Sequence, residues 1–286
     1  MLNDLVRCPT CSAALDVEAD GARCSAGHEF ASEDGVLVLL DPETLAAHPQ
    51  YAHQRRYFDA EFAAYDRYRL ENWRVGYLRR LRAAGLLQGP LVDVGVGGSG
   101  YTVIEAARSG AFAIGCDLSL DGLVRARRFA EDEGVADRTL WICCSAERLP
   151  LASGAFASAL AIAVLEHVPD DGAALDELAR VLKPGGRAWI TVPHAMQHIP
   201  LALRVPNVLH DRRLGHLRRY EAEDLLAAAE ARGLRRQDVQ YTGHTVKLLQ
   251  LAAPRWDRLW WWAERRDLRQ LQRREGSLQL SVALRA

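Results

Sequence analysis

The sequence predicts an α/β protein with a doubly wound, mostly parallel sheet of seven strands and a small module in front of it. Short apolar segments alternate with helical segments from residue 91 to the end of the chain. Several of these apolar segments have no polar face, which is typical of parallel strands covered by helices on both sides. The first 40 residues follow a different pattern, with cysteine and histidine residues close together. We therefore expect two units, a module at residues 1–42 and an α/β domain at residues 51–286.

Length and composition agree with this division. A chain of 286 residues is long enough for one full α/β domain and a small satellite. Hydrophobic residues make up 49% and charged residues 26%, as in ordinary globular proteins. No apolar run reaches the roughly 18 residues that span a bilayer, and the N-terminus lacks a signal-peptide pattern. We therefore expect a cytoplasmic protein without stable membrane insertion.

The order of apolar and helical segments predicts each element in turn. Apolar residues recur at three and four positions from residue 51 to 87, which predicts a helical region rich in aromatic residues and arginine. The predicted strands are residues 91–96, 111–116, 139–144, 155–164, 187–192, 237–242 and 278–284. The predicted helices are residues 101–109, 120–133, 172–182, 222–232 and 256–274. We expect residues 194–220 to be irregular, because they contain Pro200 and Pro206. We expect this segment and an insertion at residues 243–277 to cap the substrate side of the sheet.

Four residues of the N-terminal module have the spacing of a metal site. Cys8 and Cys11 are separated by two residues, and Cys24 and His28 by three. Three thiolates and one imidazole complete a tetrahedral shell, which is the arrangement of structural Zn²⁺. A module of some 35 residues buries too little apolar surface to fold well without a metal. The alternative is a chance grouping of cysteines.

A glycine-rich turn follows the first strand of the α/β domain. Residues 91–101 read Leu-Val-Asp-Val-Gly-Val-Gly-Gly-Ser-Gly-Tyr. Such a turn lets the backbone approach a ligand at the carboxyl edge of a parallel sheet, because glycine has no Cβ. Taken alone, it is compatible with any nucleotide-binding turn or with a tight strand-to-helix connection.

Two later strand ends make the prediction more specific. Asp117 ends the second strand, where a carboxylate can accept hydrogen bonds from both hydroxyls of a ribose. Ser145 and Ala146 follow the third strand, where a side chain and a backbone N–H can contact an adenine edge. The chain lacks a Gly-Lys-Ser/Thr phosphate loop, which disfavours a nucleoside triphosphatase. An NAD-dependent dehydrogenase is also disfavoured, since nothing resembles its second half.

Together with Glu166-His167 and the segment 177–186, these motifs resemble the class I S-adenosylmethionine-dependent methyltransferases of the type 11 group over residues 90–193. The roles that this resemblance implies run from the methionine end of the cofactor to its adenine. They are Asp93, Gly95 and Gly97 around the methionine end, Asp117 on the ribose, Leu118 against the adenine face, and Ser145 and Ala146 at the adenine edge. The chain departs from the family pattern at Ser99, which replaces the third glycine, and at Ser145, where aspartate is usual.

The resemblance implies methyl transfer to an oxygen, nitrogen or carbon atom of a small-molecule acceptor. Positioning the acceptor does most of the catalysis in such a displacement, and a general base helps when the acceptor carries a proton to be removed. His194 and His216 are the candidates for this base, because the resemblance places both near the acceptor pocket. A structural, hydrogen-bonding role is equally compatible with the sequence for each histidine.

The N-terminal module resembles the zinc knuckle of bacterial ribosomal RNA guanine methyltransferases and the zinc ribbon of tRNA-methyltransferase activator subunits. By that likeness an RNA base would be the substrate. Residues 1–50 carry two arginines and nine acidic residues, a net charge of −7, which repels phosphate and disfavours RNA. We predict instead that the module docks on the basic segment from Arg55 to Arg82. An RNA methyltransferase and a non-catalytic zinc-ribbon protein that binds the cofactor remain the alternatives.

A tryptophan-rich segment lies within the insertion. Trp256, Leu259, Trp260 and Ala263 share one face of the predicted helix. This face is compatible with core packing, or with a lid over the acceptor pocket that would suit a large apolar or aromatic acceptor. Shallow contact with a membrane surface is a third interpretation, because arginines flank the tryptophans.

Overall fold

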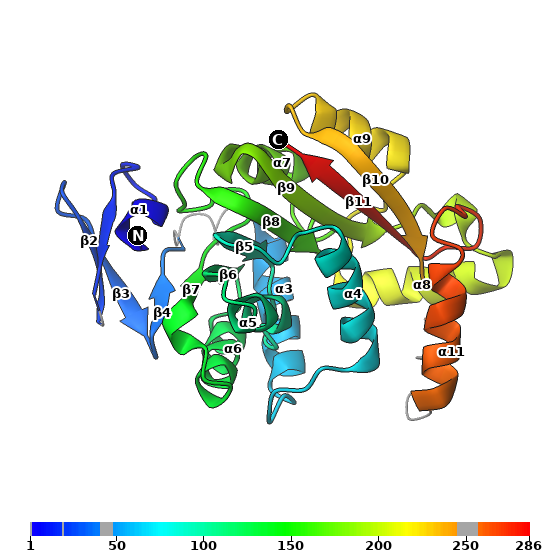
Figure 1. Ribbon diagram of the computed structural model, residues 1–286, viewed down its shortest axis with the longest axis horizontal. Helices are drawn as coiled ribbons and strands as arrows, with labels where there is room; N and C mark the ends of the chain where they lie inside the picture. The colour runs from blue at the N-terminus through cyan, green and yellow to red at the C-terminus, as the bar shows by residue number, and fades with distance from the viewer. Residues whose placement is uncertain (1, 19, 41–47, 245–256) are drawn as a thin grey trace.

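The computed structural model describes residues 2–18, 20–40, 48–244 and 257–286. Within them, eleven strands form one continuous sheet in the order β1-β2-β3-β4-β7-β6-β5-β8-β9-β11-β10 (Figure 1). Seven of these strands make up the sheet predicted from the sequence. Their bounds are Leu91–Val94 (β5), Ala113–Asp117 (β6), Thr139–Cys143 (β7), Phe156–Ile162 (β8), Leu182–Pro193 (β9), Arg235–Thr242 (β10) and Gln279–Arg285 (β11).

Parallel pairing brings several strand ends to one edge of the sheet. Strands β7, β6, β5, β8 and β9 are parallel neighbours in that order. Strand β11 then pairs antiparallel with both β9 and β10. The carboxyl ends of β5, β6, β7 and β8 therefore lie side by side, which places the turns that follow them next to one another.

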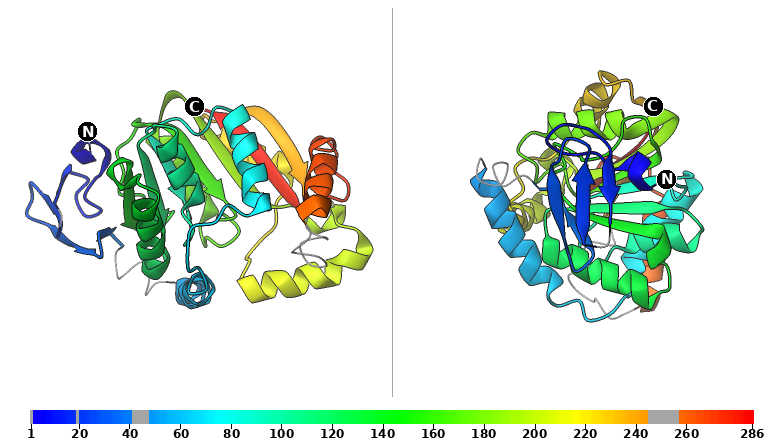
Figure 2. Two further views of the ribbon diagram at one scale, coloured as in Figure 1. Left: turned by 60° about the horizontal axis from the view of Figure 1, so that its bottom comes forward. Right: turned by 90° about the vertical axis from the view of Figure 1, so that its left-hand side faces the viewer.

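Helices cover both faces of this sheet (Figures 1 and 2). Helices α4 (Asn72–Ala83), α5 (Tyr101–Arg108) and α6 (Leu120–Asp132) lie on one face, and α7 (Asp171–Val181) and α9 (Ala222–Glu230) lie on the other. Each face has its own apolar core, and the largest fully buried side chains include Trp141 and Trp189. The doubly wound α/β architecture predicted from the sequence is therefore observed.

The N-terminal module continues the sheet. Its elements are α1 (Leu2–Leu5), β1 (Leu15–Val17), β2 (Gly21–Cys24), β3 (Glu29–Glu33) and β4 (Val36–Val38). Strand β4 pairs parallel with β7, so the module covers what would otherwise be an exposed sheet edge. The sheet is consequently mixed: the five pairings from β4 to β9 are parallel and the other five are antiparallel. The expectation of seven mostly parallel strands was wrong in this respect, because a sequence pattern predicts a strand but not its partner.

The module does not dock as predicted. Its backbone hydrogen bonds to the α/β domain go to β7 and to residues 148–152: Arg7 N–H donates to Pro150 O (2.8 Å), Ala152 N–H to Leu5 O (2.8 Å) and Leu39 N–H to Cys143 O (2.9 Å). The basic segment from Arg55 to Arg82 supplies none of these bonds. Backbone pairing at a sheet edge therefore determines the docking, and the charge complementarity we expected does not.

The helical region before the sheet divides in two. Helix α3 (Pro49–Phe62) begins with a proline, whose missing N–H is no cost in the first turn. Residues 63–71 connect the end of α3 to the start of α4. The Phe62 ring at the end of α3 lies against the glycine turn after β5, so α3 crosses the edge where the parallel strands end.

Residues 194–220 contain a helix that the sequence did not predict. After the short 3-10 turn η2 (Met196–His198), α8 spans Leu201–Leu214, with Pro206 inside it. A proline within a helix removes one hydrogen bond. No residue of α8 is buried, so water can hydrate the carbonyl that loses its partner. The irregular segment predicted from Pro200 and Pro206 was therefore wrong over residues 201–214.

The other insertion contributes α11 (Asp257–Leu268), which packs against α4; Trp256 lies outside the described residues. Trp260 and Ala263 are buried, whereas Trp262 is 47% exposed. A 3-10 turn, η1 (Ala136–Arg138), completes the described elements. Among the residues that the structure describes, no helix has both the length and the apolar character to cross a membrane.

Candidate functional site

The turn after β5 has the backbone conformation that its glycines make possible. Gly95 and Gly97 have φ angles of +70° and +65°. A Cβ on Gly95 would lie 2.3 Å from Cγ2 of Val164, so a larger residue does not fit there. Gly100, which stands one place later than the third glycine of the family pattern, also has a positive φ (+56°) and precedes the first turn of α5. The departure at Ser99 therefore leaves the turn open to a ligand.

Two carboxylates flank this turn, Asp93 buried and Asp117 half-buried. Asp117 accepts hydrogen bonds from the backbone N–H groups of Gly97 and Ser119, each at 2.9 Å. Asp93 accepts a hydrogen bond from the Thr102 hydroxyl through Oδ2, and its Oδ1 has no partner. Burial raises the pKa of both carboxyl groups, that of Asp93 to about 7. A cationic or hydroxyl-bearing ligand would supply the partner that Asp93 lacks.

A small cavity of about 110 Å³ opens beside the ends of β6 and β7. Six of the seven residues assigned to the cofactor line it, all except Asp93: Gly95, Gly97, Asp117, Leu118, Ser145 and Ala146. Helix α3 closes this cavity, since the Tyr51 hydroxyl donates to Glu147 and Gln54 Nε2 donates to His167 O at 2.6 Å. A planar base would lie between an apolar face and polar loop groups.

A larger cavity of about 470 Å³ adjoins the first, and both are lined by Gly95, Gly97 and His167. Aromatic side chains from α3, α4, α5 and α11 contribute to its wall, among them Tyr57, Tyr77 and Trp260. Asp93 lines this cavity only. Residues from both insertions also line it, among them Asn207 and Trp260. The larger cavity has room for an acceptor next to the glycine turn.

Arg74 and Tyr101 are candidate site residues that sequence reasoning missed. Arg74 is 5% exposed, and its guanidinium lies over the rings of Tyr65, Trp73 and Tyr101 at 4.9–5.5 Å. Its Nε and the Tyr101 hydroxyl are buried and have no hydrogen-bond partner. Both residues line the larger cavity, as does Asp93. One arginine among many carries no motif of its own, so only the structure could reveal it.

The two candidate bases lie in different surroundings. His216 lines the larger cavity, and its Nδ1 is 2.8 Å from Asp211 Oδ1. His194 lines neither cavity; it is fully buried, and its Nδ1 is 2.6 Å from the Ser277 hydroxyl. Burial and the neighbouring His198 lower the pKa of His194 to about 4. This placement favours a structural role for His194 and retains His216 as the candidate base.

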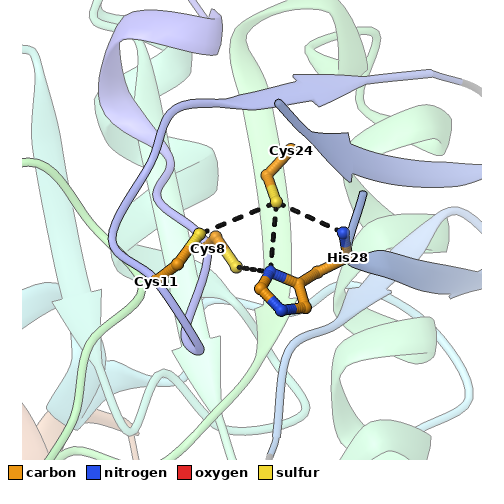
Figure 3. Close-up of side chains that lie close together, drawn as sticks. All are labelled: Cys8, Cys11, Cys24 and His28. Atoms are coloured by element: carbon orange, nitrogen blue, oxygen red, sulfur yellow. Dashed lines mark hydrogen bonds between the residues drawn. The ribbon is translucent and has the colours of Figure 1, made fainter. Parts of the chain in front are cut away.

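The four predicted metal ligands converge in the N-terminal module (Figure 3). The separations are 3.7 Å between Cys11 Sγ and Cys24 Sγ, and 3.6 Å and 3.3 Å from His28 Nδ1 to the sulfurs of Cys8 and Cys24. A tetrahedral Zn²⁺ with Zn–S bonds of about 2.3 Å requires sulfur–sulfur separations of about 3.8 Å. Burial raises the pKa of Cys24, but N–H groups of His28 and Ala26 outweigh it and lower the pKa to about 6, which favours the thiolate. The residues present therefore fit zinc.

Two other histidine clusters among the described residues also bring three ligand-type atoms within 4.8 Å. In the cluster of Glu166, His167 and His216, the last ring is bonded to Asp211. In the cluster of His194, His198 and Glu221, the guanidinium of Arg274 donates to His198 and Glu221 and so already supplies a cation. Of the three clusters, the cysteine-containing group therefore has the donor set that best fits a metal.

The N-terminal module contacts the loop that borders the small cavity. Arg148 Nη2 donates to Pro9 O at 2.5 Å, within the turn between Cys8 and Cys11. Val6 forms a β-bridge with Leu151. Ser145 and Ala146 belong to the same loop, so the module contacts a loop that also lines the small cavity.

Comparison with known proteins agrees with this geometry. Residues 92–190 match a family model described as a methyltransferase domain. The chain is 34% identical over 155 residues to a ubiquinone biosynthesis O-methyltransferase of Paracidovorax citrulli, covering 53% of this chain and 60% of that protein. It is 36% identical over 100 residues to methyltransferase GfsG of Streptomyces halstedii, covering 35% and 36%. The chain thus spans somewhat over half the length of the first curated relatives it matches.

Solved structures share the fold at low identity. Geranyl diphosphate C-methyltransferase from Streptomyces coelicolor A3(2), in complex with Mg²⁺, geranyl-S-thiolodiphosphate and S-adenosyl-L-homocysteine, superposes with a TM-score of 0.62 at 17% identity, covering 84% of this chain and 98% of that one. The [4+2]-cyclase SpnF superposes with a TM-score of 0.57 at 21% identity, covering 82% and 96%. Residues 92–190 therefore match a methyltransferase domain, and the chain shares its fold with the geranyl diphosphate C-methyltransferase.

Proposed function

We propose that the protein transfers a methyl group from S-adenosylmethionine to a small-molecule acceptor. The observation that carries this proposal is the convergence of the glycine turn, Asp117 and the Ser145-Ala146 pair around two adjoining cavities. Both the match to a methyltransferase domain and the names of the curated relatives support it. The fold alone would not suffice, because the cyclase SpnF shares it.

The residues present fit the cofactor. Asp117 would accept hydrogen bonds from the ribose, while Leu118, Ser145 and Ala146 would hold the adenine in the small cavity. At the other end, the unpartnered Oδ1 of Asp93 would accept from the methionine ammonium group. We add Arg74 to this set: its Nε, which has no hydrogen-bond partner and lies 3.8 Å from Glu71 Oε2, would donate to the methionine carboxylate. When bound, S-adenosylmethionine supplies an electrophilic methyl group on sulfur.

The acceptor that the larger cavity suits is a large apolar or aromatic molecule with polar substituents. Its volume of about 470 Å³ and its aromatic lining match a drug-sized ligand. Polar groups of Asn207, His216 and Arg219 interrupt this lining at the cap. The names of two relatives, a ubiquinone biosynthesis O-methyltransferase and a geranyl diphosphate C-methyltransferase, fit acceptors of this size.

A label-transfer screen tests the proposed function. The protein is incubated with S-adenosylmethionine that carries a labelled methyl group and with phenols, amines and carboxylic acids bearing apolar substituents. Total RNA forms a separate arm. Label in a small molecule supports the proposal, whereas label in RNA alone identifies an RNA methyltransferase. Tight cofactor binding without transfer to any acceptor would favour the non-catalytic alternative.

We also propose that Cys8, Cys11, Cys24 and His28 hold a structural zinc ion. The four ligands leave no open position for a substrate, so the metal would stabilise the module and not take part in the reaction. The sulfur and nitrogen separations in Figure 3 support this assignment.

Replacing Arg74 with glutamine should weaken binding at the methionine end of the cofactor site and leave binding at the adenine end unchanged. We expect the affinity for S-adenosylhomocysteine to fall roughly 10- to 100-fold, because a charge-assisted hydrogen bond to the carboxylate is lost. The affinity for 5′-methylthioadenosine, which has no carboxylate, should change less than about twofold. Titration calorimetry with both ligands measures the difference. An equal loss for the two nucleosides would show that Arg74 acts on the fold and not on the methionine end.

A further inference from the structure

Asp211 and His216 form a carboxylate–imidazole pair at the end of the cap segment. His216 Nδ1 lies 2.8 Å from Asp211 Oδ1, and the His216 backbone N–H donates to Asp211 O at 2.9 Å. Gly215 makes this close return possible, since it ends α8 with a φ of +72°. The His216 ring therefore has one orientation fixed by both the backbone and the side chain of Asp211.

Arg219 in turn fixes the carboxylate. Its Nε donates to Asp211 Oδ2 at 2.7 Å and its Nη2 donates to Oδ1 at 2.8 Å. Arg219 Nη1 donates to His194 O at 3.0 Å, so the pair is tied to the end of β9. Burial raises the pKa of Asp211, but the hydrogen bonds from His216 and Arg219 outweigh it and lower the pKa to about 2. Asp211 is consequently an acceptor at Nδ1 of His216, which places the imidazole proton there.

The His216 ring lies near the point where the two cavities meet. His167 lines both cavities, and its ring packs edge-on to that of His216 with 4.7 Å between the centroids. Burial and His216 lower the pKa of His167 to about 3, so His167 stays neutral. Glu166 and His210 also lie beside His216, and the His53 ring lies against Gly215. A group at this junction can contact both the acceptor and the glycine turn.

The geometry points to Asp211 as a positioning residue that holds His216 with its proton on Nδ1, so that Nε2 accepts the proton of an acceptor hydroxyl. This inference rests on the proposed function and narrows the acceptor to a hydroxyl compound, most simply a phenol. A neutral amine has a free lone pair and needs no base before attack. A buried base beside the acceptor is useful only where the attacking atom carries a proton that must leave.

The proton and the electrons balance without a further reactant. The acceptor oxygen bonds to the methyl carbon while the carbon–sulfur bond breaks and leaves its electron pair on sulfur. The hydroxyl proton moves to Nε2 of His216. The Asp211 carboxylate then faces a cationic imidazolium, as in other carboxylate–histidine pairs. Solvent takes up the proton after the product leaves.

Nitrogen NMR tests the inference without an acceptor. Protein with ¹⁵N-labelled histidine contains nine imidazoles, and the spectrum of the His216→Gln variant assigns the signals of His216. At about pH 8 we expect the wild-type ring to carry its proton on Nδ1. Asp211→Asn should mix the two neutral tautomers, whereas Asp211→Glu, which keeps the carboxylate, should retain the Nδ1–H form. Asp176→Asn is the matched control, because Asp176 is exposed and pairs with Arg232.

A wild-type His216 with its proton on Nε2, or an unchanged tautomer in Asp211→Asn, would overturn the inference. Kinetics give a second criterion: with a hydroxyl acceptor from the label screen, Asp211→Asn should lower kcat roughly 10- to 100-fold and leave cofactor affinity within about twofold. An unchanged kcat would overturn it as well. Failure of the proposed function is distinguishable, since the wild-type protein would then transfer no label to any small molecule in the screen, whatever the tautomer of His216.

Discussion

Replacing Asp117 with asparagine is expected to lower the affinity for S-adenosylhomocysteine about 100-fold. The carboxylate would accept two charge-assisted hydrogen bonds from the ribose, each worth about 1.5 to 3 kcal/mol. An amide offers one oxygen in place of two, and its NH₂ group would face a backbone donor, either the N–H of Gly97 or that of Ser119. The substitution therefore weakens both the ribose contact and the position of the glycine turn. Titration calorimetry measures the loss.

The matched control for this experiment is Asp121→Asn. Asp121 lies four residues further along the chain, in the first turn of α6, and its side chain is exposed. We expect its affinity for S-adenosylhomocysteine to stay within about twofold of the wild-type value. If Asp117→Asn behaved like this control while remaining folded, the ribose assignment would be wrong.

Removing the metal site is expected to weaken the whole protein. The purified protein should contain one zinc ion per chain by elemental analysis, and Cys24→Ser should lose it. We expect the melting temperature of that variant to fall by at least about 10 °C, because structural zinc contributes several kcal/mol to folding. Cofactor affinity should also fall, about tenfold, since the module holds the loop that carries Ser145 and Ala146.

Ser25→Ala controls for substitution in the same turn. Ser25 is exposed and follows Cys24 directly. Its zinc content, melting temperature and cofactor affinity should equal those of the wild-type protein. If the metal-free Cys24→Ser variant were as stable as the wild-type protein, zinc would have no structural role. If its cofactor affinity were also unchanged, the module would not influence the small cavity.

Much of the fold could be predicted because its signals are local. Most of the predicted strands, such as the one that begins at Leu91, are apolar runs between turn residues, and a strand is observed at each of the seven predicted positions. The pairing of β4 with β7 could not be predicted, because a run such as Val36–Val38 indicates a strand but does not show which strand it pairs with. Helix α8 was missed for a related reason: the cost of Pro206 depends on exposure, which only the tertiary structure reveals.

The candidate site divides in the same way. The glycine turn, Asp117 and the metal ligands form short motifs at fixed spacings, so their positions could be read from the chain. Arg74 and Asp211 have no such motif; they gain significance from an unpartnered nitrogen and from a hydrogen bond to His216. Sequence spacing also could not show which of His194 and His216 is the better candidate base. The structure distinguishes them, because His194 is fully buried.

A crystal structure of the protein with S-adenosylhomocysteine tests the central claim most directly. We expect the nucleoside to lie across the turn at Gly95, with its ribose hydroxyls on Asp117 and its adenine beside Ser145 and Ala146. The amino-acid end should reach Arg74 and Asp93. A crevice that stays empty at saturating ligand, or a nucleoside bound elsewhere on the protein, would contradict the account.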